Sequence, residues 1–212
     1  MDYAIQTIIS ALSLGSFYAL GALGIGLLFS VLRLINFAHG DFITVGAYAL
    51  IVPSSAVTAT LLIGDFHPAL LVLCIVGIVV MLAILSYFVV FQHAQKSSPA
   101  TMMIISFALG YTLQNIIVMI YGGRPKAAGI WSDLTGQVQI SSGVSVQLLQ
   151  LVTIAVTWIL LIALVLFLKR TRVGIQMRAA AEDFRMARML GVNGKNLIAL
   201  AFILSGGLAG IM

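Results

Sequence analysis

Charge in this chain is concentrated in one short polar segment, residues 169–196, and this concentration strongly limits how the chain can fold. Seven of the eleven basic residues and two of the six acidic residues lie in the segment. Seven minus two gives +5, which equals the net charge of the whole chain. The rest of the chain is therefore close to neutral and must fold with very few charges.

The composition is that of a membrane protein. Hydrophobic residues make up 61% of the chain and charged residues only 8%, whereas a soluble domain carries about 25% charged residues. Long uncharged apolar segments recur, and about 20 such residues span a bilayer as a helix. A barrel would show short alternating strands instead. We therefore predict an all-α fold, a polytopic transmembrane helical bundle that forms a single domain over residues 1–212.

About six membrane segments are predicted. They cover residues 1–32, 43–63, 69–91, 100–121, 147–168 and 197–212. The last segment holds about 16 apolar residues, fewer than a comfortable span requires, so we expect the chain to be incomplete at its C-terminus. Excess Lys and Arg marks the cytoplasmic side. Residues 169–196 and 92–99 are therefore expected inside, and the amino terminus and residues 122–146 outside.

A second polar cluster, Asn36, His39 and Asp41, follows the first apolar segment. Such side chains are costly at membrane depth. They form either a short cytoplasmic or interfacial turn after Arg33, or a broken helix whose polar groups line a cavity or gate. With Gly40, they are the candidate residues of a translocation path or gate. His39 and Asp41 alone offer too few ligands for a metal ion, and we expect neither a metal nor a cofactor.

Within the charged segment, residues 174–191 suit one helix of about four turns. An apolar stripe recurs along it at three- and four-residue steps: Met177, Ala180, Ala181, Phe184, Ala187 and Leu190. Because this stripe is mostly alanine, it anchors poorly in lipid and fits closely into a protein groove. We therefore favour a docking helix over a basic helix that lies on anionic lipid. Gly191 is expected to end the helix and Asn193 to cap the next one.

Two separate stretches resemble one family. Residues 177–193, from Met-Arg-Ala-Ala-Ala-Glu-Asp-Phe to Leu-Gly-Val-Asn, resemble the cytoplasmic loop of permease subunits in branched-chain amino acid ABC importers. Residues 13–20 and then residues 35–41, Ile-Asn-Phe-Ala-His-Gly-Asp, resemble the amino-terminal signature of the same family, in the subunit that carries Asn-Phe-Ala-His-Gly. The resemblance covers essentially the whole chain. Asp41 stands where glutamate is common, and the strict Glu-Ala-Ala-x-x-x-Gly pattern of importers at large is missing.

The resemblance implies a mechanism, a location and partners. The partners are two cytoplasmic ABC ATPase subunits, a second permease subunit and a periplasmic substrate-binding protein, assembled at the bacterial inner membrane. The substrates are branched-chain amino acids, with urea or short-chain amides as an alternative within the family. The resemblance also implies an ATPase-coupling interface at Arg178, Ala181, Glu182, Phe184, Arg185, Arg188 and Gly191.

Other classes of protein fit the sequence less well. An ion-coupled secondary transporter would carry ionisable residues inside the membrane, and the apolar segments between residues 43 and 168 hold none, so only residues 36–41 could serve. An enzyme is not expected, because a His-Glu-x-x-His motif is lacking and the patterns of intramembrane proteases are incomplete. The pI of about 9.7 reflects the cytoplasmic loop, so no nucleic-acid partner is expected.

Overall fold

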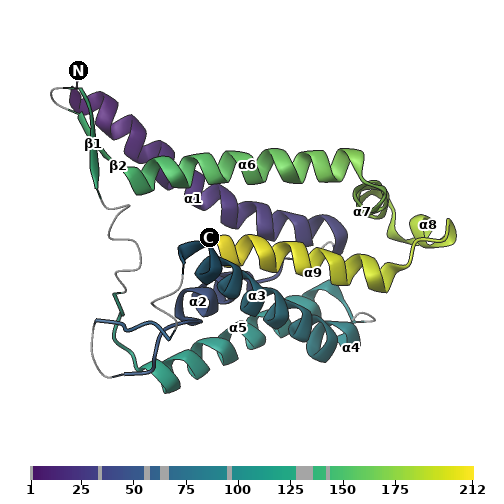
Figure 1. The fold of residues 1–212 in the computed structure, drawn as a ribbon. Helices are drawn as coiled ribbons and strands as arrows, with labels where there is room; N and C mark the ends of the chain where they lie inside the picture. The colour runs from purple at the N-terminus through teal and green to yellow at the C-terminus, as the bar shows by residue number, and fades with distance from the viewer. Residues whose placement is uncertain are drawn as a thin grey trace.

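The computed structural model describes residues 2–32, 35–54, 58–62, 67–94, 97–127, 136–141 and 144–212. These residues form a bundle of helices with a small antiparallel sheet at one end (Figure 1). The helices are α1 (Asp2–Leu32), α2 (His39–Tyr48), α3 (Pro68–Ser86), the π-helix η1 (Tyr87–Phe91), α4 (Gln92–Ala94), α5 (Pro99–Tyr121), α6 (Leu148–Arg170), α7 (Arg172–Glu182), α8 (Phe184–Met189) and α9 (Gly194–Ile211). The strands are β1 (Gln137–Ser141) and β2 (Val144–Gln147).

Five helical spans among the described residues are long and apolar enough to cross a membrane: Tyr3–Val31, Ala69–Ala94, Pro99–Tyr121, Leu148–Arg170 and Gly194–Ile211. Many large hydrophobic side chains on them are exposed, among them Leu73 and Met119. A water-soluble protein rarely exposes large apolar patches, whereas lipid tails solvate them. The predicted all-α membrane bundle is confirmed.

The predicted second segment, residues 43–63, is wrong as a continuous span. Its helix, α2, starts earlier, at His39, and ends at Tyr48. The chain then turns back on itself, because the Leu62 amide donates to the Leu50 carbonyl at 2.9 Å and an isolated bridge joins Ile51 to Leu61. A proline and a pair of serines follow Val52 in the sequence, and proline removes a backbone donor that a continuing helix needs. In place of the predicted span, the described chain has an irregular segment, residues 35–38, followed by the short helix α2.

The two ends of the bundle are clearly different. At one side of the bundle, called here the α8 end, the last turns of α1 lie together with the helices α4, α7 and α8 (Figure 1). The amino terminus, the β1–β2 sheet and the end of α5 lie at the opposite end. The segments that share an end are those that the distribution of basic residues predicts to lie on the same side of the membrane.

Helix α9 lies inside the bundle and packs closely against α3. A Cβ added to Gly206 would lie 2.7 Å from the Ala83 Cβ, and one added to Gly210 would lie 2.8 Å from the Val76 Cα. Two small residues four positions apart allow membrane helices to approach in this way. Nearby, the Phe202 ring packs on two aromatic rings of η1, Tyr87 and Phe91, at centroid distances of 5.5 and 5.0 Å.

Candidate functional site

The polar cluster at the start of α2 lies inside the bundle. Asn36 and His39 are each only 1% exposed, and Asp41 is 8% exposed; Gly40 is exposed. Their side chains and backbone contact residues of α1, α5 and α9, well away from the ends of those helices. The cluster is therefore buried between helices rather than exposed, and its role in a path or gate stays a prediction.

His39 is held between α1 and α9. Its Nδ1 lies 3.0 Å from the Ser205 Oγ, and the same oxygen lies 3.0 Å from the Gly24 carbonyl oxygen. A hydroxyl has one hydrogen and a carbonyl only accepts, so Ser205 donates to Gly24 and accepts from the Nδ1–H of His39. The ring also lies directly against α1, since a Cβ on Gly24 would come within 2.4 Å of Nε2. Gly24 is therefore required for His39 to fit.

Asp41 is held by α5 in a similar way. The Gln114 Nε2 donates to Asp41 Oδ1 at 2.7 Å. The other carboxylate oxygen lies against Gly110, where an added Cβ would come within 2.2 Å of Oδ2. The neighbouring amide of Asn115 instead donates to the Tyr111 carbonyl of its own helix. Gln114 is therefore the α5 amide that reaches the cluster.

Asn36 shapes the irregular backbone that precedes α2. Its Oδ1 accepts from the Ala38 amide at 3.2 Å, a local turn that asparagine favours. The Phe37 amide donates to the Ser106 Oγ of α5, also at 3.2 Å. These bonds satisfy backbone groups that a helix would otherwise satisfy, which irregular backbone at membrane depth requires.

Two buried polar atoms of this cluster have no hydrogen-bond partner in the described structure: Asn36 Nδ2 and His39 Nε2. Most buried polar atoms in proteins are bonded, so an exception calls for an explanation. Nδ2 is a donor, and Nε2 is an acceptor when Nδ1 carries the hydrogen. Among the described residues, the cluster therefore holds one donor group and one acceptor without partners.

The charged segment folds as two helices, and the prediction of one helix over residues 174–191 is wrong. The break lies at Asp183, whose backbone is extended (φ −146°, ψ 104°) and whose carboxylate accepts from the amides of Arg185 and Met186 at 2.8 and 3.0 Å. Aspartate favours this capping role over a helix interior. The predicted stop at Gly191 is confirmed by its φ of +90°, and Asn193 caps α9 as expected.

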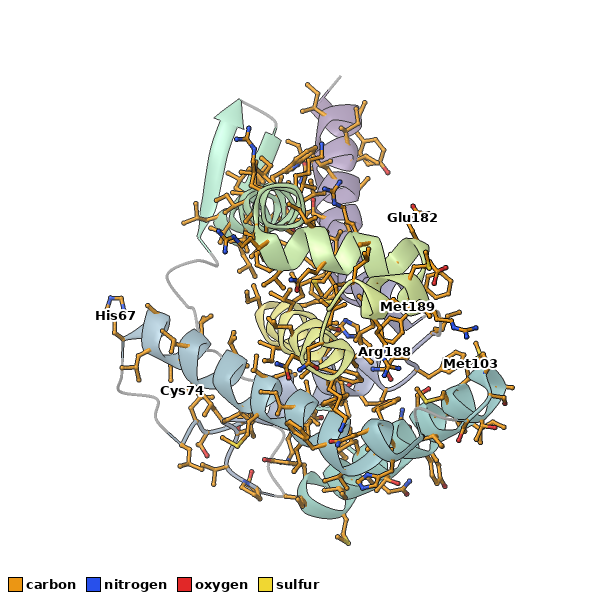
Figure 2. The ribbon with its side chains drawn as sticks, turned by 90° about the vertical axis from the view of Figure 1, so that its right-hand side faces the viewer. His67, Cys74, Met103, Glu182, Arg188 and Met189 are labelled. Atoms are coloured by element: carbon orange, nitrogen blue, oxygen red, sulfur yellow. The ribbon has the colours of Figure 1, made fainter. Side chains whose placement is uncertain are left out.

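The apolar stripe of this segment faces mostly inward, contrary to the prediction that it docks into a partner. Met177, Ala180 and Ala187 are buried against the chain's own bundle. The exposed apolar side chains on α8 and at the residue that follows it are Met186, Met189 (70%) and Leu190 (83%). Figure 2 shows Glu182, Arg188 and Met189 at this end. Of the seven predicted interface residues, Ala181 and Phe184 are half-buried, and the others are exposed: Arg178, Glu182, Arg185, Arg188 and Gly191.

A cavity of about 420 Å³ opens where α8 leads into α9. It is lined by Phe184, Arg188 and residues 191–195. The Tyr87 hydroxyl of η1 donates to the Lys195 carbonyl at 3.1 Å and ties the first turn of α9 to the neighbouring helix. From that turn α9 runs without a break to Ser205, which contacts His39.

Sequence reasoning missed the small residues that complete the buried cluster: Gly24, Ser106, Gly110 and Ser205. Each makes room for, or bonds to, a polar group of another segment. A partial signal was present, because Ser205 directly precedes a pair of glycines spaced for close packing, Gly206 and Gly210. The partner across each contact becomes visible only in the folded chain.

Comparison with known proteins agrees with this architecture. The family model for the permease component of branched-chain amino acid transport systems matches residues 7–212. The permease protein BraD of a high-affinity branched-chain amino acid transport system in Pseudomonas aeruginosa is 28% identical over 215 residues, which cover 98% of this chain and 68% of BraD.

Similarity extends to further permeases of the same description. LivH of Escherichia coli K12 is 30% identical over 218 residues, covering 99% of this chain and 69% of LivH. A probable LivH of Methanocaldococcus jannaschii is 28% identical over 198 residues, covering 90% of this chain and 59% of that protein. No solved structure matches. The chain is thus a multi-pass membrane protein and belongs to the family of permease components of branched-chain amino acid transport systems.

Proposed function

We propose that this chain is a permease subunit of an ATP-driven ABC importer and forms part of the translocation path for branched-chain amino acids. Family membership and the names of the similar permeases support the substrate class. In this proposal the α8 end is cytoplasmic and the membrane is the bacterial inner membrane, because basic residues collect on the cytoplasmic side and most of them lie at the α8 end.

One observation carries the mechanism: a single unbroken helix joins the exposed α8 end to the buried polar cluster. Helix α9 begins at the Asn193 cap, directly after α8 and the Gly191 turn, and reaches His39 through Ser205. A helix is stiff along its axis, so a force on α8 moves Ser205. We propose that ATP-driven motion of a partner travels along α9 to the cluster and alternates the access of the path.

The surface for this partner is the exposed face around α8. Met186, Met189 and Leu190 form an apolar centre on and just after α8. Exposed arginines accompany it on the same helix, Arg185 and Arg188, and on α7, Arg178. An apolar centre within a polar rim is typical of protein interfaces. The cationic rim fits an ATPase groove that carries carboxylates, and two such ATPase subunits would serve a pair of permeases.

The path itself is proposed to pass the cluster at the start of α2. Asn36 Nδ2 and His39 Nε2 are a buried donor and acceptor without partners. A second permease would complete the path, and a periplasmic binding protein would deliver the amino acid at the opposite end of the bundle. In this proposal the chain forms one membrane domain, and residues 169–196 are the coupling loop of that domain.

The coupling surface is tested by placing a charge in its apolar centre. Met189→Glu and Leu190→Glu are expected to reduce the amount of ATPase that co-purifies with the permease by at least about ten-fold, because burying an unpaired carboxylate at an interface is costly. Leu62→Glu is the matched control, because Leu62 is an exposed leucine that pairs with Leu50 and lies outside α7 and α8. Normal ATPase recovery with both α8 variants would overturn the coupling proposal.

The path is tested by comparing transport with abundance. His39→Ala and Asp41→Ala are expected to lower ATP-dependent uptake of leucine in proteoliposomes more than they lower the amount of protein in the membrane. Equal losses in both would assign the cluster a folding role only. Uptake that follows a proton or sodium gradient without ATP would support the secondary-transporter alternative.

A further inference from the structure

A groove of about 450 Å³ runs between α1 and α6. Its α1 wall is made of small and apolar residues that include Ala22, Gly26 and Ser30, and its α6 wall is made of Leu161, Leu164 and Leu168. The hydroxyl of Ser30 donates to the Leu27 carbonyl of its own helix at 2.7 Å. The groove therefore presents an almost entirely apolar lining.

The groove has the length and openness of a binding site for one hydrocarbon chain. Its α1 wall extends from Ala19 to Ser30, which is roughly 16 Å at 1.5 Å per residue. A Cβ on Gly26 would meet nothing within 4 Å, so the space above it is open. Towards the opposite end, Thr157 of α6 approaches the Ser16 carbonyl of α1 at 3.4 Å, and the two helices meet there.

The other end of the groove is cationic. Leu168, in its wall, is followed directly by Lys169 and Arg170, both exposed, and then by the exposed Arg172 at the start of α7. Helix α7 packs against both α1 and α6 at this end, and Gly174 lets it approach the Phe167 carbonyl. Neither α1 nor α6 carries an acidic residue, apart from Asp2 at the far end of α1. These cations therefore have no counter-charge on the helices that form the groove.

We propose that this groove binds one anionic phospholipid, with an acyl chain along α1 and α6 and its phosphate among Lys169, Arg170 and Arg172. An apolar channel that ends in a basic cluster at the cytoplasmic side of a membrane bundle matches the two parts of such a lipid. A zwitterionic lipid offers the same chains without the net charge. The proposal rests on the membrane placement of the bundle and does not depend on coupling to ATP.

The headgroup site is tested by lipid competition. The purified transporter is equilibrated in detergent with equal amounts of phosphatidylglycerol and phosphatidylcholine, and the lipids that stay bound to this chain are counted by native mass spectrometry. Each cation near a surface gives about a five-fold preference for an anionic lipid. The double variant Lys169→Gln/Arg170→Gln is therefore expected to lower the phosphatidylglycerol preference by about ten-fold or more, and Arg124→Gln, an exposed arginine at the opposite end, by less than about two-fold. Equal retention of both lipids by the unchanged protein would overturn the proposal.

The acyl-chain site is tested by filling the groove. Gly26→Leu places a side chain in open space within it and is expected to abolish the retained lipid. Gly15→Leu is the matched control, because Gly15 lies on the same helix, also has nothing within 4 Å of an added Cβ, and does not line the groove. Lipid retention unaffected by Gly26→Leu would overturn the site.

The occupant is identified by crosslinking in membranes. A photoactivatable benzoylphenylalanine in place of Phe29, an exposed aromatic residue about one turn from Gly26 that does not line the groove, is expected to capture a phospholipid, seen as a mass increase of one lipid on this chain. Capture of a polypeptide, whether from a second permease or another helix, would show that the groove is a protein interface and would overturn the lipid proposal.

Discussion

Two polar regions of this chain contrast sharply. The cluster at the start of α2 has few charges and is buried, and most of its polar groups are bonded to residues of other helices. The α7–α8 segment carries many charges, is largely exposed, and bonds mainly within itself, as at Asp183. The first region depends on the fit of neighbouring helices, whereas the second leaves a surface available to another protein.

The contrast has an energetic origin. A buried polar group without a partner costs about 1–3 kcal/mol, so the first region retains such groups only where close packing holds them. A solvent-exposed charge has no such cost, so substitutions on the α8 surface change stability by within about 0.5 kcal/mol. Mutations in the first region should therefore lower stability as well as transport, whereas those in the second should affect assembly with little change in stability.

The largest effect is expected at Gly24. Gly24→Leu puts a side chain where the His39 ring lies, since the first added carbon already comes within 2.4 Å of Nε2. Overpacking of this severity costs at least about 3 kcal/mol, and we expect little folded protein in the membrane. Gly26→Leu, two residues along the same helix, should express normally. The measurement is the thermal unfolding midpoint in detergent, and equal midpoints for the two variants would contradict the packing of His39 on Gly24.

A smaller loss is expected at Gln114. Gln114→Leu keeps the volume but removes the donor to Asp41, and hydrogen bonds to charged groups contribute about 1.5–3 kcal/mol. Asn115→Leu, which removes an amide that bonds only to its own helix, should cost less than about 0.5 kcal/mol. A double-mutant cycle with Asp41→Ala, which removes the acceptor, measures the coupling directly, and a coupling energy near zero would show that the two side chains do not interact.

Much of the fold could be predicted from the sequence, because long apolar segments and a single basic loop leave few alternatives. The segment predicted over residues 100–121 is confirmed as α5, which begins at Pro99 with Ser98 accepting from the Thr101 amide. The second membrane segment was misplaced. Apolar residues continue beyond Tyr48, but hydropathy does not distinguish a helix from the paired, strand-like segments formed by residues 50–52 and 60–62.

The candidate site was predicted only in part. Asn36, His39 and Asp41 stood out because polar residues are costly beside apolar segments. The glycines and serines that contact them did not stand out, because these residue types are common in membrane helices and gain a role only through contacts across the bundle. The prediction of a single helix around Asp183 was wrong for a related reason, because an aspartate within a helical pattern can equally cap a new helix.

The last prediction separates structure from mechanism at Ser205. Ser205→Ala removes the bonds to His39 and to the Gly24 carbonyl, and a single buried hydrogen bond contributes about 1 kcal/mol to stability. Ser106→Ala is the matched control, because Ser106 is equally buried and serves the same cluster from α5. If α9 carries motion from the α8 end to His39, Ser205→Ala should leave ATP hydrolysis in proteoliposomes intact and reduce amino acid uptake several-fold. Ser106→Ala should lose as much stability as Ser205→Ala but keep uptake proportional to ATP hydrolysis. The same loss of uptake in both variants would mean that the cluster supports the fold without transmitting motion along α9.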